Sequence, residues 1–353
     1  MDPVDPVALA RELIDIDSTT GREGAAARTL AAYLRARGLA VLEQPLVAAE
    51  SDVERGGPLE ASADRINVIA AAGEPAVVFS THIDCVPPFF PSRLEGGRLF
   101  GRGACDAKGI LAAQVGAVER LRARGETRVG LVVVAGEERG SDGARAANRM
   151  ASRSRYLING EPTDNRLGSA TRGVFRVRLV TRGIAVHSGY PDLGRSAIEL
   201  LVDVLVCLRE ARWPEDPVLG RTHYTVAFIA GGVAPNVVPP NAEAELTFRS
   251  VGAHDEIRRV LAAAVGDRAS LHEMVEVPPV RLTTPEGFET AVFAYTTDIP
   301  LLTNWGTPLL VGPGSIHVAH TDHEHVRVDE LHEAVDLYER LALLLLDRSQ
   351  AIG

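Results

Sequence analysis

Five side chains of the kinds that bind divalent metals stand at the ends of short apolar runs or just before a helical stretch: His82, Asp106, Glu138, Glu161 and His320. His82 follows VVFST, Glu138 follows GLVVVAGE, Glu161 follows YLING and His320 follows PLLVGPGSIHVA. The set contains imidazole and carboxylate but no thiolate. That combination suits zinc, with cobalt or manganese as alternatives.

The Glu137-Glu138 pair could supply both a metal ligand and a proton acceptor. Two metals about 3.5–4 Å apart need a bridging carboxylate. A general base must then take a proton from the attacking water and pass it to the leaving nitrogen. Asp84, two residues after His82, is expected to orient that imidazole. The pattern predicts a two-metal amidohydrolase.

Each of these features alone would more often be a solvated surface group. Their convergence at one side of a sheet is what favours a metal site. Spacing alone does not select one imidazole in the C-terminal segment, which also contains His317, His323, His325 and His332. The segment GRGACDAKG lacks the Lys-Ser/Thr and the spacing of a phosphate-binding loop, which argues against nucleotide binding.

Alternating strands and helices are expected to position these residues. Strand-length apolar runs at 67–70, 76–80, 129–135 and 156–158 alternate with helical stretches at 109–124 and 142–150, the pattern of an α/β domain with a mostly parallel sheet. Ligands of such sheets bind beyond the carboxyl ends of the strands. Asp5-Pro6 is expected to open a helix, and Thr20-Gly-Arg-Glu23 fits a capping box before a second helix that ends near Gly38.

A second pattern begins near Gly168 and predicts an inserted domain of β-α-β-β-α-β type, an α+β ferredoxin-like arrangement. We expect residues 1–169 and 287–353 to form the catalytic domain and residues 170–286 a lid and dimerisation domain. The stretch AIELLVDVLVCL at 197–208 is apolar on nearly every helical face. One apolar face can pack on the sheet of its own domain, and the remaining apolar surface suggests burial against a second copy, and so a homodimer.

The overall composition of the chain argues against some classes of binding partner. The 353 residues carry 47 acidic and 37 basic side chains, a net charge of -10, which argues against nucleic acid and anionic membranes. The first residues lack the charge pattern of a signal peptide, and no apolar run is long enough to span a bilayer. Three cysteines without a C-x-x-C pair make disulfides unexpected and a cytoplasmic location the default.

Taken together, the segments resemble the aminoacylase, acetylornithine deacetylase and succinyl-diaminopimelate desuccinylase family of zinc metallopeptidases over nearly the whole chain. The motifs that carry the resemblance are H-x-D-x-V-P at 82–87, G-R-G-x-x-D-x-K-G at 101–109, Glu-Glu at 137–138, Glu-Pro at 161–162, G-x-x-x-H-S-x-x-P at 183–191, G-G-x-x-x-N-V-x-P at 231–239 and G-P-G-S-I-x-x-A-H at 312–320. The last motif looks most similar to acetylornithine and acetylcitrulline deacetylases, although residues 297–299 read Thr-Asp-Ile where those enzymes have Thr-Glu-Ala.

The resemblance assigns roles to these positions. It implies that His82 and Glu161 hold one metal, that Glu138 and His320 hold the other, that Asp106 bridges them and that Glu137 is the base. His187 would reach the active site of a partner subunit and stabilise the oxyanion. Asn236 and Arg249 would bind substrate, Arg249 through the α-carboxylate. Gly314 would supply backbone contacts.

The expected activity is hydrolysis of an N-acyl amino acid, with acetylornithine-type deacetylation in arginine biosynthesis as the first specific candidate. The alternatives within the same chemistry are a metallo-dipeptidase or carboxypeptidase, or a hydrolase of acetylcitrulline or of carrier-linked lysine or ornithine. The alternative from another class is a non-catalytic, metal-stabilised homodimer that binds amino acids. A general base at Glu137 argues against that alternative, because binding alone needs none.

Overall fold

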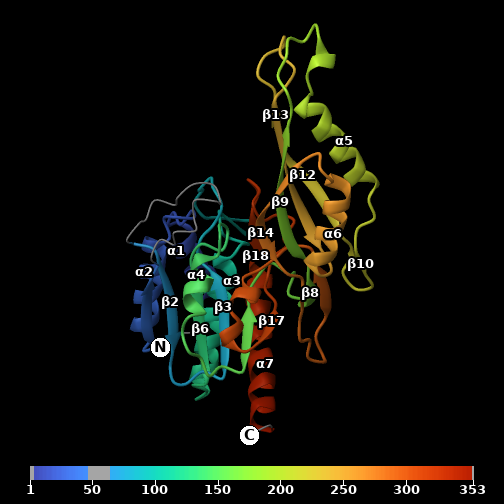
Figure 1. Cartoon of the computed structure of the whole chain (residues 1–353). Coiled ribbons are helices and arrows are strands. Elements are labelled where there is room, and N and C mark those ends of the chain that lie inside the picture. Colours follow the sequence, from blue (N-terminus) through green and yellow to red (C-terminus); the bar gives the residue numbers. More distant parts are fainter. Residues whose placement is uncertain (1–3, 47–63, 352–353) are drawn as a thin grey trace. The chain divides into compact units, whose positions relative to one another are not determined.

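The computed structural model describes residues 4–46 and 64–351, which form two compact units (Figure 1). Unit 1 comprises Met1–Ser169, Leu282–Ala291 and Thr297–Gly353, and unit 2 comprises Ala170–Arg281 and Val292–Thr296. No helix among the described residues is long and apolar enough to cross a membrane. All three cysteines are free thiols.

Unit 1 is built on a six-stranded sheet in the order β1-β2-β6-β3-β7-β17. Neighbours among β6, β3, β7 and β17 run parallel, whereas β2 is antiparallel to both β6 and β1. The expected α/β fold with a mostly parallel sheet is therefore confirmed. The strand bounds are β1 Ala40–Pro45, β2 Ile66–Ala71, β3 Val77–His82, β6 Val129–Val134, β7 Tyr156–Asn159 and β17 Thr307–Leu310.

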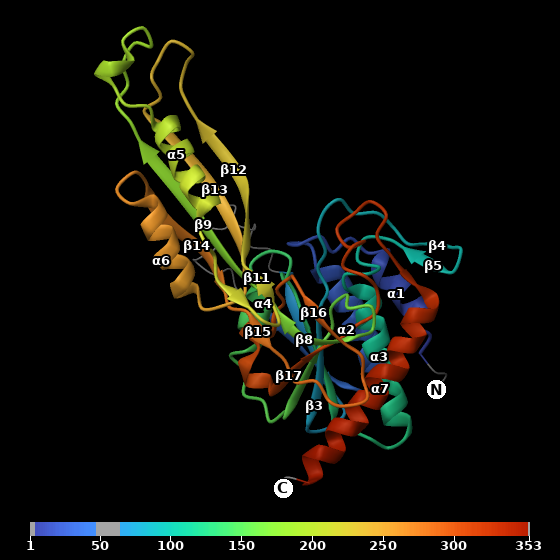
Figure 2. The same ribbon diagram turned by 90° about the vertical axis from the view of Figure 1, so that its right-hand side faces the viewer.

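Helices cover both faces of this sheet, as Figure 2 shows from the side. The helices of unit 1 are α1 Pro6–Ile14, α2 Gly24–Ala36, α3 Lys108–Ala123, α4 Asp142–Ala147 and α7 Val328–Ala351. Phe79 and Leu131 pack in one core with α1, α2, α3 and α7, and the Phe79 ring meets Tyr338 of α7 edge-on at 5.5 Å. The alternate residues Val78 and Val132 pack in a smaller core with α4. Burial on both faces explains why β3 and β6 are continuous apolar runs.

A small three-stranded sheet in unit 1 joins two distant segments. It has the order β18-β5-β4, with β4 at Arg93–Glu95, β5 at Arg98–Phe100 and β18 at His325–Arg327. Val326 of β18 lies opposite Leu99 of β5. Strand pairing thereby holds the segment that follows His320 against the segment that precedes Gly101.

Unit 2 has a four-stranded antiparallel sheet in the order β12-β13-β9-β14. Its main elements follow the chain as β9 Gly173–Arg182, α5 Ala197–Glu210, β12 His223–Gly231, β13 Asn241–Ser250, α6 His254–Val265 and β14 Ser270–Val277. This is the expected β-α-β-β-α-β succession. Leu201 of α5 and Leu261 of α6 are buried in one core with Phe175 and Phe248 of the sheet.

The chain passes between the units at short paired strands and not in a proline-rich linker. The remaining strands are β8 Leu167–Thr171, β10 Glu215–Asp216, β11 Gly220–Arg221, β15 Val280–Arg281 and β16 Thr290–Phe293. Val280 pairs with Thr171 and Arg281 with Ala170, whereas Leu282 already donates its N–H to the Ser169 carbonyl of unit 1. The long stretch of unit 2 thus ends at Arg281, where β15 finishes, and the chain enters unit 2 once more at Val292–Thr296.

The capping box expected at Thr20–Glu23 is wrong. Helix α2 begins at Gly24, and Glu23 at its N-cap makes no side-chain capping bond. The Glu23 carboxylate instead binds the guanidinium of Arg65, and the Thr20 hydroxyl donates to Asp84. These long-range partners outcompete the local cap, which sequence spacing alone cannot foresee.

Candidate metal centre

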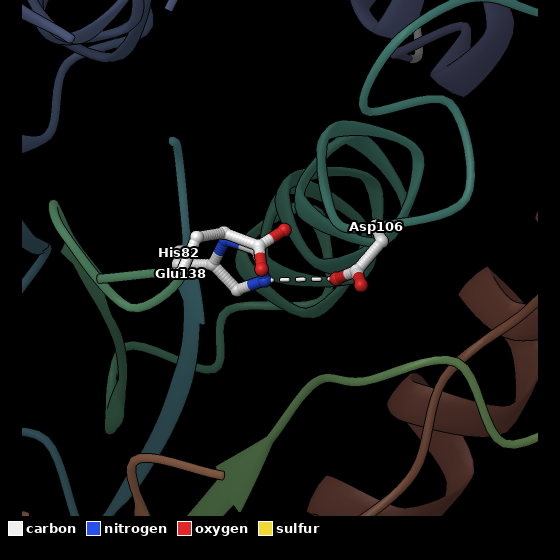
Figure 3. Close-up of side chains that lie close together, drawn as sticks. All are labelled: His82, Asp106 and Glu138. Carbon is white, nitrogen blue, oxygen red and sulfur yellow. Dashed lines mark hydrogen bonds and ion pairs between the residues drawn. The ribbon is translucent and has the colours of Figure 1, made fainter. Parts of the chain in front are cut away.

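Three segments of unit 1 bring His82, Asp106 and Glu138 together (Figure 3). His82 is the last residue of β3, Asp106 lies just before α3, and Glu138 lies in the turn after β6. One ligand atom from each of the three lies within 4.8 Å of the other two. Because β3 and β6 are parallel neighbours, their carboxyl ends deliver the imidazole and the glutamate to the same edge of the sheet.

Asp106 lies between two imidazoles. Its Oδ1 is 2.9 Å from His82 Nε2, and its Oδ2 is 3.3 Å from His320 Nε2. On the outer sides, Glu161 Oε2 is 4.0 Å from His82 Nε2 and Glu138 Oε1 is 2.9 Å from His320 Nε2. All five predicted ligands therefore gather, with each aspartate oxygen facing one imidazole and one glutamate flanking each imidazole.

The charge of this cluster fits divalent cations. Burial raises the pKa of Glu138, and burial raises the pKa of Glu161 well above its usual range. Hydrogen bonds to Asp106 and Glu138 raise the pKa of His320 to about 10. One oxygen of Glu161 is buried without a hydrogen-bond partner among the residues that the structure describes. Such an excess of buried negative charge, with an unpartnered oxygen, is what bound cations would neutralise.

Glu137 stands beside the ligand positions with a strongly perturbed carboxyl group. Burial, followed by the nearby charge of Glu161, raises the pKa of Glu137 well above its usual range. A carboxylate with a raised pKa is a stronger proton acceptor, as a general base near neutral pH must be. This environment is compatible with the predicted role of Glu137.

Asp84 lies against His82, as the sequence predicts, and it also binds a neighbouring turn. Its Oδ1 accepts the N–H groups of Gly136 at 2.9 Å and Glu137 at 3.0 Å. Its Oδ2 accepts the N–H of Glu138 at 3.2 Å and the Thr20 hydroxyl at 2.8 Å. His82 Nδ1 lies 3.0 Å from the Asp84 backbone carbonyl but 3.5 Å from the carboxylate. Both the carbonyl and the carboxylate of Asp84 thus face the imidazole, and the carboxylate also holds the Glu137-Glu138 turn.

A buried ion-pair network that sequence reasoning missed lies behind the same turn. Arg65 is 5% exposed and binds both Glu23 and Asp142 through its guanidinium. Gly136 has φ +82°, and a Cβ there would collide with Asp142 and approach Arg65 Nη2 to 2.5 Å. Only glycine fits beneath this pair, one residue before Glu137. Nothing in the local sequence marks Arg65 as buried.

Asp298 is a further buried acid near the site. Burial raises the pKa of Asp298 to about 6, and the nearby Ser141 hydroxyl acts in the opposite direction. Its charge acts on both Glu137 and Glu161. In the sequence, Asp298 is marked only by the departure of residues 297–299, Thr-Asp-Ile, from the Thr-Glu-Ala segment of acetylornithine deacetylases.

Gly314, the predicted backbone contact, is buried beside the Asp106 loop. It has φ +81°, and a Cβ there would approach Cys105 Sγ to 2.7 Å. Its carbonyl accepts the N–H of Asp164 at 2.8 Å. The backbone therefore runs unusually close to the residue preceding Asp106, which only glycine allows.

The three predicted functional residues of unit 2 fall into two places. His187 forms a bridge with Val237, and Ser188 N–H donates to the Asn236 carbonyl at 2.9 Å, so His187 and Asn236 lie in neighbouring loops. Arg249 lies near the end of β13, whose first residue is Asn241. The extended strand between those two residues spans about 27 Å. His187, paired with Val237 just before β13, and Arg249, near the end of β13, therefore lie toward opposite ends of this strand.

Comparison with known proteins gives the family. Residues 78–344 match peptidase family M20/M25/M40. A probable carboxypeptidase of Aspergillus terreus is 37% identical over 94% of this chain and 84% of its own. The fold is similar to that of the aminopeptidase PepT of Bacillus cereus, at 20% identity with a TM-score of 0.75 over 97% of both chains. It is also similar to an M20 family metallo-carboxypeptidase of Sulfolobus solfataricus, at 17% identity with a TM-score of 0.73 over 98% and 99% of the two chains.

These names support a metallopeptidase and not the narrower acetylornithine deacetylase resemblance. The match to the family covers most of the chain, and the relative from Aspergillus terreus aligns over nearly all of it. The chain belongs to peptidase family M20/M25/M40.

Proposed function

We propose that this protein is a two-metal hydrolase that cleaves an amide bond next to a free α-carboxylate, as a carboxypeptidase or dipeptidase does. The observation that carries the proposal is Asp106, with one oxygen toward His82 and the other toward His320, and with Glu137 beside them. The carboxypeptidase name of the relative from Aspergillus terreus supports a peptide substrate.

In this proposal Glu161 and His82 would hold one cation and Glu138 and His320 the other, with Asp106 as the ligand that the two cations would share. Zinc suits this ligand set best, with cobalt or manganese as alternatives. Bound cations polarise the scissile carbonyl and lower the pKa of water to about 7.

Glu137 takes the proton from the attacking water and returns it to the leaving nitrogen, so that the amine departs neutral. The Asp84 carboxylate holds the backbone of Glu137, which keeps the proton acceptor in place through the turnover. The proposal predicts that Glu137→Gln loses nearly all amide hydrolysis, a fall of about 10²–10⁴ in kcat. If that variant turned over substrate at the wild-type rate, the mechanism would be wrong.

Arg249 is our candidate for binding the α-carboxylate. Burial, together with the nearby charge of Arg176, lowers the pKa of Arg249. No acidic partner of its guanidinium is found among the described residues, so the group is available to an anion. Arg249→Lys keeps the charge but loses the planar pair of donors. It should raise KM for peptides with a free C-terminus far more than for the corresponding C-terminal amides. Equal effects on both would remove Arg249 from substrate binding.

N-acyl amino acids are the second candidate class, with acetylornithine as its specific member. The observation that favours them is the G-P-G-S-I-x-x-A-H segment at 312–320, which is similar to that of acetylornithine deacetylases. A panel of dipeptides, longer peptides and N-acyl amino acids, assayed with zinc, cobalt and manganese, distinguishes the classes. Absence of any hydrolysis by the metal-loaded protein would instead favour an amino-acid-binding protein.

We further propose a homodimer formed through unit 2. Val202 and Val206 of α5 are 48% and 43% exposed, and Phe228 and Ile229 of the edge strand β12 are 48% and 57% exposed. Apolar side chains exposed together on one unit are typical of an interface. His187 and Arg249 lie toward opposite ends of β13. His187 is therefore too far from a small substrate held by Arg249 of its own chain, which supports a role for His187 in the site of the partner.

Mixed dimers test this arrangement. Glu137→Ala and His187→Ala homodimers should both be nearly inactive. In a mixed dimer, the chain with His187→Ala keeps its own Glu137 and receives His187 from its partner. Co-refolding the two variants should restore up to about one quarter of wild-type activity. Confirmed subunit exchange without any recovered activity would contradict the role in trans.

A further inference from the structure

Glu324 is a fully buried carboxylate that binds the backbone of the loop before α3. Its Oε1 accepts three N–H groups, from Gly103 at 2.9 Å, Cys105 at 3.2 Å and Asp106 at 3.1 Å. A carboxylate that accepts several backbone N–H groups makes strong, charge-assisted hydrogen bonds. One oxygen of Glu324 therefore binds the backbone of this loop at three points between Gly103 and Asp106.

Arg102 supplies the opposite charge. Its Nη1 donates to the other oxygen of Glu324 at 2.6 Å, and the side chain is only 2% exposed. The guanidinium also packs on Phe90, 4.8 Å from the ring centre, and Arg102 Nε donates to the Pro88 carbonyl at 3.2 Å. Arg102 is thus held on several sides, and it fixes the carboxylate of Glu324 in turn.

The same short segment carries His320 and Glu324. Gly101 N–H donates to the Glu324 carbonyl at 3.2 Å, and β18 begins at the next residue and pairs with β5. The backbone that positions His320 is therefore tied to the backbone that positions Asp106. The loop itself contains Gly101 and Gly103, both with positive φ, and glycines leave a chain conformationally free unless something external restrains it.

We propose that Glu324 is a positioning residue for the metal centre: by holding three N–H groups of the Asp106 loop, it keeps the two oxygens of Asp106 directed at His82 and His320. This inference rests on the proposed metal-dependent function. It differs from a purely structural role, in which the Arg102–Glu324 pair would stabilise the fold without affecting the geometry of Asp106.

Glu324→Gln tests the proposal with little change in volume. The amide has one oxygen and one NH₂ group, so either orientation sets an N–H donor against another donor, from the loop or from Arg102. We expect the metal-free variant to fold but to exchange the amide hydrogens of Gly103, Cys105 and Asp106 at least about tenfold faster. Its affinity for Zn²⁺, measured by chelator competition, should fall about 10- to 100-fold.

Glu119→Gln is the matched control. Glu119 is a mostly buried acid of α3 that pairs with Arg37 and Arg122, at 3.6 Å and 2.6 Å. It lies about 16 Å along the helix from Lys108. This variant should lower Tm while leaving Zn²⁺ affinity and amide exchange at residues 103–106 unchanged.

The outcomes distinguish a failure of the proposed role of Glu324 from a failure of the proposed metal-dependent function. Wild-type affinity and wild-type amide exchange in Glu324→Gln would overturn the proposal, and so would an equal loss of affinity in Glu119→Gln. If Glu324→Gln does not fold, Arg102→Lys replaces it, since Lys keeps the charge but offers a single attachment point. Wild-type exchange and affinity in Arg102→Lys would then overturn the proposal. If the wild-type protein binds no Zn²⁺, the proposed function fails, while amide exchange still tests whether Glu324 restrains the loop.

Discussion

Replacing Asp84 by Asn should weaken metal binding mainly through the Glu137-Glu138 turn and less through His82, whose Nδ1 is 3.5 Å from the carboxylate. His82 Nδ1 faces the Asp84 backbone carbonyl, which the substitution leaves in place. The carboxylate, in contrast, accepts three backbone N–H groups and one hydroxyl. An Asn side chain must direct its NH₂ group at one side of this set. The least costly orientation places NH₂ at Oδ2, because the Thr20 hydroxyl can rotate and accept, which leaves only the N–H of Glu138 unpaired.

The expected cost follows from this count of hydrogen bonds. A buried N–H left without an acceptor costs about 1–3 kcal/mol, and a hydrogen bond to a charged acceptor exceeds one to a neutral acceptor by about 1 kcal/mol. One orphaned N–H and two bonds that lose their charged acceptor give a loss of about 3–5 kcal/mol in the free energy of unfolding. The environment of Asp84 lowers its pKa despite burial, chiefly through His82 and Thr20, so the charged form is the one that the fold favours.

Urea unfolding of the metal-free protein measures the stability term, and chelator competition measures metal affinity, which should fall about 10- to 100-fold. Because the orphaned N–H belongs to Glu138, the losses of affinity in Asp84→Asn and Glu138→Gln should not add in the double variant. Thr20→Val is the control. It removes the hydroxyl and leaves all three N–H bonds, so it should cost only about 1 kcal/mol and leave metal affinity intact. Unchanged affinity in Asp84→Asn, or an equal loss in Thr20→Val, would refute the reasoning.

Three further predictions concern protons and ligands. Glu137→Gln should retain metal but lose about 10²–10⁴ in kcat, whereas Glu138→Gln should lose metal first; reversed phenotypes in metal analysis and turnover would exchange the two roles. Because the pKa of His320 in the metal-free protein is about 10, a proton must leave when metal binds near pH 7. Metal affinity should therefore rise with pH up to about 10, with proton release detectable by calorimetry in different buffers, and a flat profile would contradict this. Asp298 has a pKa raised from 3.8 to about 6, so its favourable contribution is present below pH 3.8 and is lost as pH rises through about 6. In the metal-free protein, Asp298→Asn should therefore gain up to about 3 kcal/mol relative to wild type between pH 4 and pH 8 in urea unfolding, and a pH-independent difference would exclude a buried ionised Asp298.

The sequence was most informative where one short segment carries both the structural and the chemical signal. The run VVFST followed by His82 predicts a buried strand and a ligand at its carboxyl end, and the structure has β3 ending at His82 beside Asp106. The spacing of apolar residues, every second residue in strands and every 3.6 residues in helices, likewise predicted the order of elements in unit 2. Whether these side chains bind metal stays a prediction.

Sequence reasoning failed where a charged residue has its partner far along the chain. Thr20 and Glu23 have the spacing of a capping box, yet their side chains contact Asp84 and Arg65. The stretch Thr-Asp-His-Glu at 321–324 is polar throughout, yet Glu324 is fully buried against the Asp106 loop. A buried acid and a solvated acid have the same letter in a sequence, and only the packing around them distinguishes the two.

The paired strands at the boundary between the units also bear on how such a chain can be cut and rejoined. The chain leaves unit 1 after Ser169 and returns at Leu282, and these two residues are hydrogen-bonded to each other at 3.0 Å. Antiparallel neighbours of this kind can be closed by a two-residue turn. A deletion or transplant design could therefore join Ser169 to Leu282 and remove residues 170–281, while the short stretch Val292–Thr296 of unit 2 would need redesign, because its partner residues leave with the deletion. The shortened chain would keep every predicted metal ligand and Glu137, while the new junction would serve as a graft point for a different module.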